Sequence, residues 1–534
     1  MNKILRKLVC AGLAASLMLG AFAGCNGGSG GGSANKTVVI GLATDLKTLD
    51  TGHMYEVYGN MVAYAMYDML FRIEGKDMAN PKPSLATEDW TLDETGTVYT
   101  LPLRQDVTFT SGNKLTAKDV VWTIQRVINL KSNTAAHVAG IQSVEATDEY
   151  TVVITLKEPD ASFLTKLASN AYCILDSEVV KANGGTDAAD AATADTARAY
   201  LDSHSAGSGP FILENWVAGS ELTLVKNEKY WGTTGNVEKI IIKEIPDANT
   251  QIQMLENGEI DMALSLNADN ISQLEGKSGV TILNDQTAVC SFLLMNDDPA
   301  VGGPMANPDV QQAVRLAIDY QGLKQMCGEG ATLPLSIVPQ GFVGAKTRSD
   351  NYRNVEQAKE LMAKAGYADG FDIELTAANY NSEGMQWPTI AQKVQADLKE
   401  IGINVNIKTA EFSVILDPYR NGEIPFLVMH WSPDYYDINN QLAFLPGDTV
   451  GERAKWSVDG SNQAMIDLGN KIVGESDKTL RAQYSEQLQD LMAENSPYAF
   501  LLQHPKVYAV RDSLESVVYN DLCKVQLTEL KVKE

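Results

Sequence analysis

A strand, a helix and a second strand follow one another in the segment from residue 371 to residue 407. Alternating apolar residues predict strands at Phe371–Leu375 and Ile403–Ile407, and apolar residues at helical spacing predict a helix over 389–401. A crossover through one helix joins strands that are parallel in the same sheet. The chain is therefore expected to build a sheet covered by helices, which is an α/β fold.

Several other elements are marked by their ends. A capping box predicts a helix after Thr116, an N-cap followed by proline predicts one after Asn307, and Asp247 is expected to cap a helix that stops at Gly258. The stretch 182–208, rich in Ala and Asp, fits either a helix or a loop. Further elements are expected as a helix at 356–365 and strands at 98–101, 150–156, 259–264 and 424–429.

The charge balance excludes some classes of function. The 534 residues include 43 Lys and Arg against 68 Asp and Glu, a formal net charge of −25. A nucleic-acid-binding protein needs a clustered basic surface, so no nucleic-acid partner is expected. This length suits about two to four domains with substantial cores.

The first 35 residues resemble an export and lipidation signal. Three basic residues precede an uncharged stretch, 8–24, that is too short and too rich in Gly and Ser for a good membrane span. The small residues before Cys25 resemble a bacterial lipoprotein processing site, although Phe22 departs from the usual Leu. We therefore expect a signal peptide at 1–24 and a lipidated Cys25 at the head of a flexible Gly/Ser linker, 25–35. Plain secretion with cleavage nearby is the alternative.

The cysteines and histidines suggest neither a metal site nor a catalytic motif. Cys173, Cys290, Cys327 and Cys523 form no CxxC pair, and buried free thiols are favoured over the three possible disulfide pairings. No two histidines stand at the i,i+4 spacing of a helix-borne metal pair. Neither a cofactor, a metal nor an enzymatic activity is expected, although the many acidic residues leave a hydrolase possible.

Five blocks, in order, resemble the extracellular solute-binding proteins of family 5, which include the dipeptide- and oligopeptide-binding subunits of ABC importers. The similarity runs from about residue 38 to about residue 508. The blocks are 103–120, with its Leu-Arg-Gln-Asp-Val-Thr-Phe start, Gly207–Phe211, Asn227–Trp231, Asn307–Asp319, and the early Lys47–Asp50.

The resemblance implies a bilobed clamshell of the type II periplasmic-binding-protein kind, with an additional α/β domain inserted in lobe one. Two chain crossings, near 287 and near 502, would form the hinge on which the lobes close. The implied boundaries are 36–80, 209–287 and 502–534 for lobe one, 81–208 for the additional domain, and 288–501 for lobe two.

The candidate ligand site follows the predicted strand at 424–429. Polarity changes abruptly there, and in open α/β sheets ligands bind beyond the carboxyl ends of strands. By resemblance, Asp434 matches the aspartate that pairs with a peptide's α-ammonium, and Trp431 and Tyr435 match the aromatic positions around it. Tyr436 completes this loop. A turn-capping role for Asp434 is the alternative.

A second group of candidates follows the Lys47–Asp50 motif. His53 and Tyr55 lie where relatives send a loop toward the cleft, although a packed surface loop is as good an interpretation. His430 is expected behind the site, and Trp387 and Tyr380 are expected in the core of lobe two.

Together these features predict a lipid-anchored, extracytoplasmic binding protein. It would act as a monomer, capture short peptides or another amine-bearing solute, and deliver them to ABC permease subunits with their ATPases. The alternatives are an oligosaccharide, opine or metal-chelate ligand on the same fold, a secreted hydrolase, or an adhesin or chaperone-like protein with an exposed apolar patch.

Overall fold

The computed structural model describes residues 36–43, 46–54, 56 and 58–534. The predicted signal peptide, Cys25, the linker and Tyr55 lie outside the described residues. The compact body comprises Thr37–Lys533, and it alone is described below.

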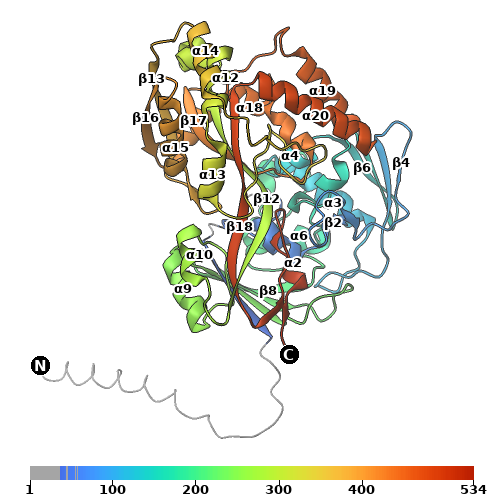
Figure 1. Ribbon diagram of the computed structural model, residues 1–534. Helices are drawn as coiled ribbons and strands as arrows, with labels where there is room; N and C mark the ends of the chain where they lie inside the picture. Colours follow the sequence, from blue (N-terminus) through green and yellow to red (C-terminus); the bar gives the residue numbers. More distant parts are fainter. Residues whose placement is uncertain (1–35, 44–45, 55, 57) are drawn as a thin grey trace, which may run out of the picture. The chain divides into compact units, whose positions relative to one another are not determined.

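One ten-stranded mixed sheet runs through both halves of the body (Figure 1). Its order, from one edge to the other, is β16-β13-β17-β12-β18-β11-β1-β10-β9-β8. The three strands at the first edge belong to the predicted lobe two, and the five at the other edge belong to lobe one. The strands span β1 Thr37–Leu42, β8 Phe211–Val217, β9 Glu221–Lys226, β10 Lys239–Glu244, β11 Met262–Ala263, β12 Val280–Met295, β13 Phe371–Ala378, β16 Ile403–Ala410, β17 Phe426–Trp431 and β18 Tyr498–Arg511.

Strands β12 and β18 join the two halves. They pair antiparallel from Val280 opposite Arg511 to Leu294 opposite Tyr498, with register irregularities between residues 286 and 292. From Cys290 onward β12 also pairs with β17, and at Ala509 and Val510 β18 pairs with β11. The irregular stretch lies beside the crossing predicted near 287, where a local break in the ladder permits bending. The domain boundaries themselves stay predictions.

The strand–helix–strand prediction is confirmed. β13 and β16 pair in parallel from Phe371 opposite Ile403, and α15 (Trp387–Lys399) makes the crossover. Trp387, expected in the core, is fully buried at the start of this helix. The other helices of this half are α11 Pro299–Gly302, α12 Pro308–Ala317, α13 Tyr320–Cys327, α14 Val355–Lys364, α16 Phe412–Arg420, α17 Ile438–Gln441, α18 Thr449–Arg453, α19 Gln463–Gly474 and α20 Lys478–Glu494.

The predicted caps are also confirmed. The Asn307 side chain accepts from the Asp309 N–H at 2.9 Å, and the Asp247 side chain accepts from the Thr250 N–H at 2.7 Å. The Asp119 carboxylate accepts from the backbone N–H of Thr116 at 3.0 Å. Each contact satisfies an N–H that the helix leaves without a partner. The corresponding helices are α3 Ala117–Leu130 and α9 Ala248–Asn257, together with α12.

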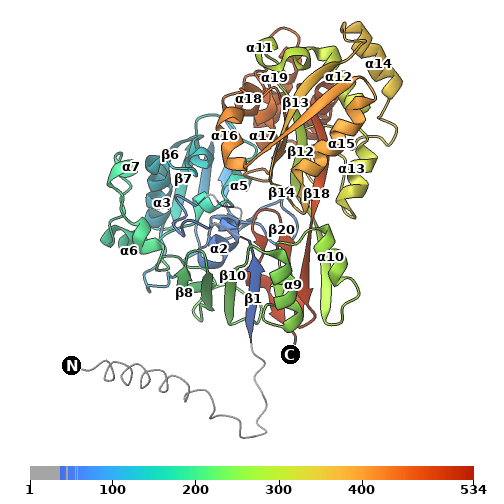
Figure 2. The same ribbon diagram turned by 90° about the vertical axis from the view of Figure 1, so that its left-hand side faces the viewer.

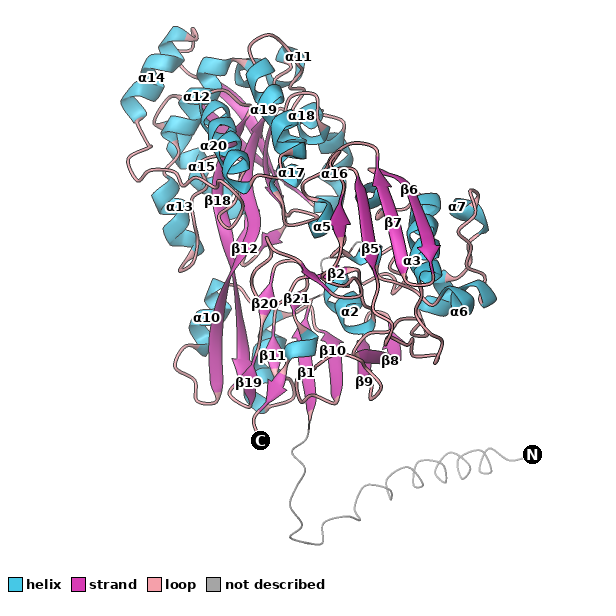
Figure 3. Ribbon diagram, turned by 90° about the vertical axis from the view of Figure 1, so that its right-hand side faces the viewer, coloured by secondary structure: helices cyan, strands magenta, loops and turns pink. Residues whose placement is uncertain are grey.

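The additional domain has its own sheet and its own core. Four strands pair antiparallel in the order β4-β5-β7-β6, with α3 packed beside them (Figure 3). Leu101, Ile124 and Ile154 are fully buried between sheet and helix. The undecided stretch 182–208 holds two single-turn helices joined by turns. The elements are β4 Thr91–Leu92, β5 Val98–Pro102, β6 Ile141–Asp148, β7 Thr151–Leu156, α4 Ala135–Val138, α5 Phe163–Lys166, α6 Ser177–Ala182, α7 Ala191–Ala194 and α8 Arg198–Leu201.

Short hairpins and helices complete the body; Figure 2 shows α2, α9 and β1 of lobe one together. Two strand predictions need correction. The strand expected at 259–264 is reduced to β11, and β17 begins two residues later than expected and continues through Trp431. The remaining elements are α2 Gly59–Met66, α10 Ala268–Leu274, and the pairs β2 Phe71–Arg72 with β3 Lys82–Pro83, β14 Asn381–Ser382 with β15 Met385–Gln386, β19 Leu514–Ser516 with β22 Lys531–Val532, and β20 Tyr519–Asn520 with β21 Lys524–Val525.

The four cysteines of the body are free thiols, in agreement with the favoured interpretation. Cys173, Cys290 and Cys523 are buried and Cys327 is half-buried. Among the helices of the described residues, none combines the length and the apolar character needed to cross a bilayer.

Candidate ligand cleft

A cavity of about 640 Å³ lies where the two lobes face each other. Its volume is in the range of small-molecule sites. Lobe one contributes segments before α2, around α10 and from β18, and lobe two contributes the β14–β15 hairpin and the end of β17. The polar side chains of its lining are Tyr58, Ser265, Asn267, Asn270, Asn379, Tyr380, Asn381, Ser382, Glu383, His430, Ser432, Lys506 and Lys524.

The end of β17 leads from this cavity to a second one. Ser432 lines the first cavity, and Tyr435 lines a cavity of about 570 Å³ between lobe two and the additional domain. Asp434 stands between them in the chain. In the wall of the second cavity, the ammonium nitrogen of Lys166 lies 4.7 Å from the centre of the Tyr435 ring. The His137 ring meets the same ring edge-on. The segment 432–435 therefore connects two concave surfaces.

Asp434 influences the titration of its neighbours. Burial lowers the pKa of His137, and the negative charge of Asp434 acts in the opposite direction. Burial raises the pKa of Tyr435 well above its usual value, with a smaller contribution from Asp434. The Asp434 side chain lines neither of the two cavities, so its contact with a ligand stays a prediction.

Trp431 lies at the last position of β17 and is half-buried. Its indole Nε1 donates to Asn440 at 3.2 Å, and its ring meets Phe444 edge-on at 5.4 Å. The hydrogen bond fixes the ring orientation beside the turn that carries Asp434. Its contact with a ligand stays a prediction.

Tyr436 has a different environment from Tyr435, which lines the second cavity. Tyr436 is 8% exposed, and its ring packs against Phe342 with centroids 4.3 Å apart. A side chain at Gly341 would collide with the Tyr436 hydroxyl. These contacts give Tyr436 a packing role inside lobe two, so its predicted ligand contact has no support from the geometry.

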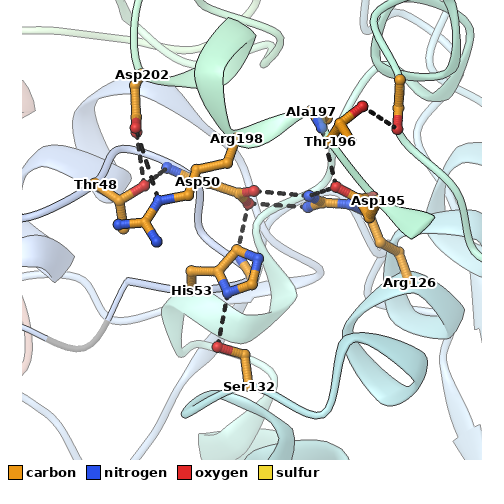
Figure 4. A network of polar contacts seen from close by, with 12 residues as sticks. Thr48, Asp50, His53, Arg126, Ser132, Asp195, Thr196, Ala197, Arg198 and Asp202 are labelled. Carbon is orange, nitrogen blue, oxygen red and sulfur yellow. Dashed lines mark hydrogen bonds and ion pairs between the residues drawn. The ribbon is translucent and has the colours of Figure 1, made fainter. Parts of the chain in front are cut away.

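His53 lies in the loop between β1 and α2 of lobe one. Its Nδ1 is 2.8 Å from the Ser132 hydroxyl, which comes from the segment after α3 (Figure 4). The ring is half-buried. The structure thus ties His53 to the additional domain, and its contact with a ligand stays a prediction.

A buried network holds the same loop (Figure 4). Arg126 of α3 donates to both oxygens of Asp50, at 2.9 and 2.7 Å, and to both oxygens of Asp195, at 2.8 and 3.0 Å. Although burial would raise the pKa of Asp195, the Arg126 guanidinium lowers it. The network anchors the His53 loop to the additional domain.

Three charged residues that the sequence analysis did not select, Glu383, Lys506 and Lys524, line the inter-lobe cavity. Lys506 and Lys524 are 7% and 5% exposed, and Glu383 pairs with Lys506 at 2.8 Å. Lys524 pairs with Asp521 at 2.8 Å. Glu383 comes from lobe two and the lysines from lobe one, so one ion pair bridges the lobes. Glu383 and Lys506 lie 123 positions apart in the chain. They belong to no motif, and only a buried charge in an otherwise apolar segment around Lys506 signals them.

The histidines beside these charged residues, His430 and His504, are neutral at pH 7. Burial lowers the pKa of His430 to about 4 and that of His504 to about 3. His430 was expected behind the site, but it lines the cavity, and its Nδ1 lies 2.8 Å from the Ser382 hydroxyl. Tyr380, expected in the core, lines the cavity as well. Among the described residues, no cluster of three His, Cys, Asp or Glu side chains suits a metal ion.

Comparison with known proteins places the chain in a family. The model of the bacterial extracellular solute-binding proteins, family 5 middle region, matches residues 80–452. A probable D,D-dipeptide-binding periplasmic protein of Escherichia coli is 25% identical over 91% of this chain and 92% of its own length. A heme-binding protein A of Haemophilus influenzae is 26% identical over 82% of each chain.

Solved structures confirm the fold class. A dipeptide-binding protein from Pseudoalteromonas, in complex with Met-Leu, superposes with a TM-score of 0.76 at 22% identity, over 93% of this chain and all of that one. The body is thus the bilobed α/β clamshell with an additional domain that the sequence predicted. The chain belongs to the bacterial extracellular solute-binding proteins of family 5, an extracytoplasmic family that binds solutes for import.

Proposed function

We propose that this protein captures short peptides between its two lobes and delivers them to the permease of an ABC importer. The inter-lobe cavity of about 640 Å³, lined by polar side chains from both lobes, carries the proposal. The similarity to the dipeptide-binding proteins of Escherichia coli supports peptides as the ligand class.

The α-ammonium of the peptide is proposed to pair with Asp434. This carboxylate follows the strand that ends at Trp431, and its negative charge acts on the titration of Tyr435, the next residue in the chain. An ammonium removed from water needs a paired charge, because an unpaired one costs several kcal/mol. The free amine should therefore be a strict requirement for binding.

Closure of the lobes is proposed as the working motion. β12 and β18 run through both lobes, and their ladder is irregular between residues 286 and 292. A ligand that touches both cavity walls binds the closed form better than the open form and shifts the population toward it. The permease subunits would then recognise the closed form, with the protein acting as a monomer and without covalent chemistry.

The proposed anchor is a lipid on Cys25, after removal of residues 1–24. One lipidated cysteine and the Gly/Ser linker up to residue 35 would keep the body close to the membrane. Cys25→Ser should move the exported protein from the membrane fraction to the soluble fraction. Equal membrane retention of the variant would contradict lipid anchoring at this residue.

Calorimetric titration tests the ligand class. The body, freed of ligand, should release or absorb heat with a pool of di- to hexapeptides and show none with the same peptides acetylated at the amine. Asp434→Asn should weaken binding by about 30-fold or more, as expected when one partner of a buried charge pair is removed. Asp417→Asn is the matched control, because the Asp417 side chain is 85% exposed on α16. Equal binding of both pools would contradict the role of Asp434. The absence of any binding heat with either pool would contradict a peptide ligand.

A further inference from the structure

Two charged residues in a strained backbone conformation line the inter-lobe cavity. Among the described residues, four that are not glycine have positive φ, and Glu383 (+44°) and Lys524 (+57°) are two of them. This conformation costs an ordinary side chain about 1–3 kcal/mol and often marks a functional site. Both side chains line the same cavity although they come from different lobes.

The turn at Glu383 is built from an unusual residue. Glu383 and Gly384 form the two-residue connection between β14 and β15, both with positive φ. Such turns prefer Asn or Asp at the first position, because their short side chains tolerate the left-handed region. Glutamate at this position carries its carboxylate farther from the backbone, and here the carboxylate reaches Lys506 across the lobe boundary.

The charged groups around the Glu383 carboxylate form a preformed binding site for a negatively charged group. Burial alone would raise the pKa of Glu383, but the charges of Lys506 and Lys524 hold it at about 2. Burial alone would lower the pKa of Lys506, but Glu383 raises it above its usual value. Both lysines are more than nine-tenths buried, so their ammonium groups have few alternatives in water.

Lys506 and Lys524 supply the positive charge beside the Glu383 carboxylate, because the neighbouring histidines are neutral. His430 and His504 are neutral at pH 7, and Asp521 is engaged with Lys524 and with the backbone N–H of Ala288 at 2.7 Å. Ala288 lies in the irregular stretch of β12. The preformed binding site is therefore connected to the segment that joins the lobes.

We propose that Lys506 and Lys524 form a subsite for a carboxylate of the solute, and that Glu383 occupies this subsite until the solute displaces it. The subsite rests on the proposed solute-binding role of the cleft, but it does not require the solute to be a peptide. It assigns the acidic end of the ligand to lobe one and makes the β14–β15 hairpin an internal competitor.

A paired panel tests the subsite. Di- to hexapeptides with free carboxylates are titrated against the same peptides as C-terminal amides, alongside opines and sugar acids and their neutral amides. Binding of the acids about 30-fold or more tighter than of the amides is expected. Equal affinity of acids and amides overturns the subsite while leaving peptide binding intact. Preference for non-peptide acids, with no peptide bound, supports the subsite and contradicts the peptide ligand. Failure of every acid in the panel overturns the subsite as well.

Substitution of Glu383 distinguishes a competitor from a latch. Glu383→Gln removes the competing charge and should tighten the binding of acids by about tenfold. A group that occupies the subsite lowers the apparent affinity for the solute, and the variant removes that group's charge. If the Glu383–Lys506 pair instead only holds the lobes closed, the same variant weakens binding, and that result overturns the proposal. Lys506→Met should abolish the preference for acids over amides.

Two controls keep these variants interpretable. The double variant Glu383→Gln/Lys506→Met leaves no unpaired partner of this ion pair, and it should fold and still show no preference between acids and amides. The cross-strand pair Glu374–Lys408, at 3.0 Å, is largely exposed on β13 and β16. Glu374→Gln and Lys408→Met should leave both affinities unchanged.

Discussion

The charged side chains buried in this protein occur in networks that neutralise each other. Arg126 is fully buried and holds Asp50 and Asp195, which come from segments about 145 residues apart. Removal of the guanidinium leaves two buried carboxylates without their partner. The network therefore contributes to stability mainly through the penalty for breaking it.

Arg126→Met is expected to lower the free energy of unfolding by about 3–5 kcal/mol. Urea denaturation followed by circular dichroism measures this difference. Lys359→Met is the matched control, because the Lys359–Glu356 pair is exposed and such pairs contribute about 0–1 kcal/mol. Equal effects of the two substitutions would contradict the assigned role of Arg126.

The stability of the body should decrease in acid through Glu383. Its pKa falls from 4.5 in the unfolded chain to about 2 in the folded protein, so the ionised form stabilises the fold above the unfolded pKa. This stabilisation is lost as the pH falls toward the folded pKa, by about 2 kcal/mol between pH 6 and pH 3. Urea midpoints at the two pH values should show a smaller loss for Glu383→Gln/Lys506→Met than for the wild type. Identical losses would contradict the depressed pKa.

At the scale of single elements, helix starts were the most predictable features. A helix start could be predicted from each of the capping residues Asn307, Asp247 and Thr116, because a cap depends on residues within one turn of each other. Asn307→Ala should lower the free energy of unfolding by about 1 kcal/mol, and Asn307→Asp should restore it by keeping an acceptor for the Asp309 N–H. Urea denaturation of the three proteins provides the comparison. Failure of Asp to rescue would show that Asn307 acts other than as a cap.

Strand ends and long-range contacts were less predictable. The polarity change at His430 suggested that β17 ends there, yet pairing with β12 carries the strand through Trp431. The ladder is set by the partner strand, about 140 residues away, and not by local composition. For the same reason the sequence indicated Asp434, which lies in a local motif, but not the Glu383–Lys506 pair, whose members meet only through the fold.

At the scale of the molecule, the arrangement predicted from the family resemblance is present. Two lobes share one sheet through β12 and β18, and a cavity with polar walls lies between them. Because ligand binding draws on both lobes, it should stabilise the whole body and not one lobe alone.

A bound peptide at about 100 times its dissociation constant should add about 2.7 kcal/mol to the free energy of unfolding. Small-angle scattering should at the same time show a smaller radius of gyration, because the lobes close. With binding about 30-fold weaker, Asp434→Asn should gain less than about 1 kcal/mol at the same peptide concentration and should compact less. Asp417→Asn should show both changes in full. Stabilisation without compaction would contradict closure as the working motion.

The central claim is that a peptide lies between the lobes with its amine on Asp434. A crystal structure of the body with a bound dipeptide tests it most directly. The claim predicts a distance of about 2.7–3.2 Å between the ligand nitrogen and an oxygen of Asp434. A peptide bound between the lobes with its amine on another group, or bound outside the cavity, would contradict it.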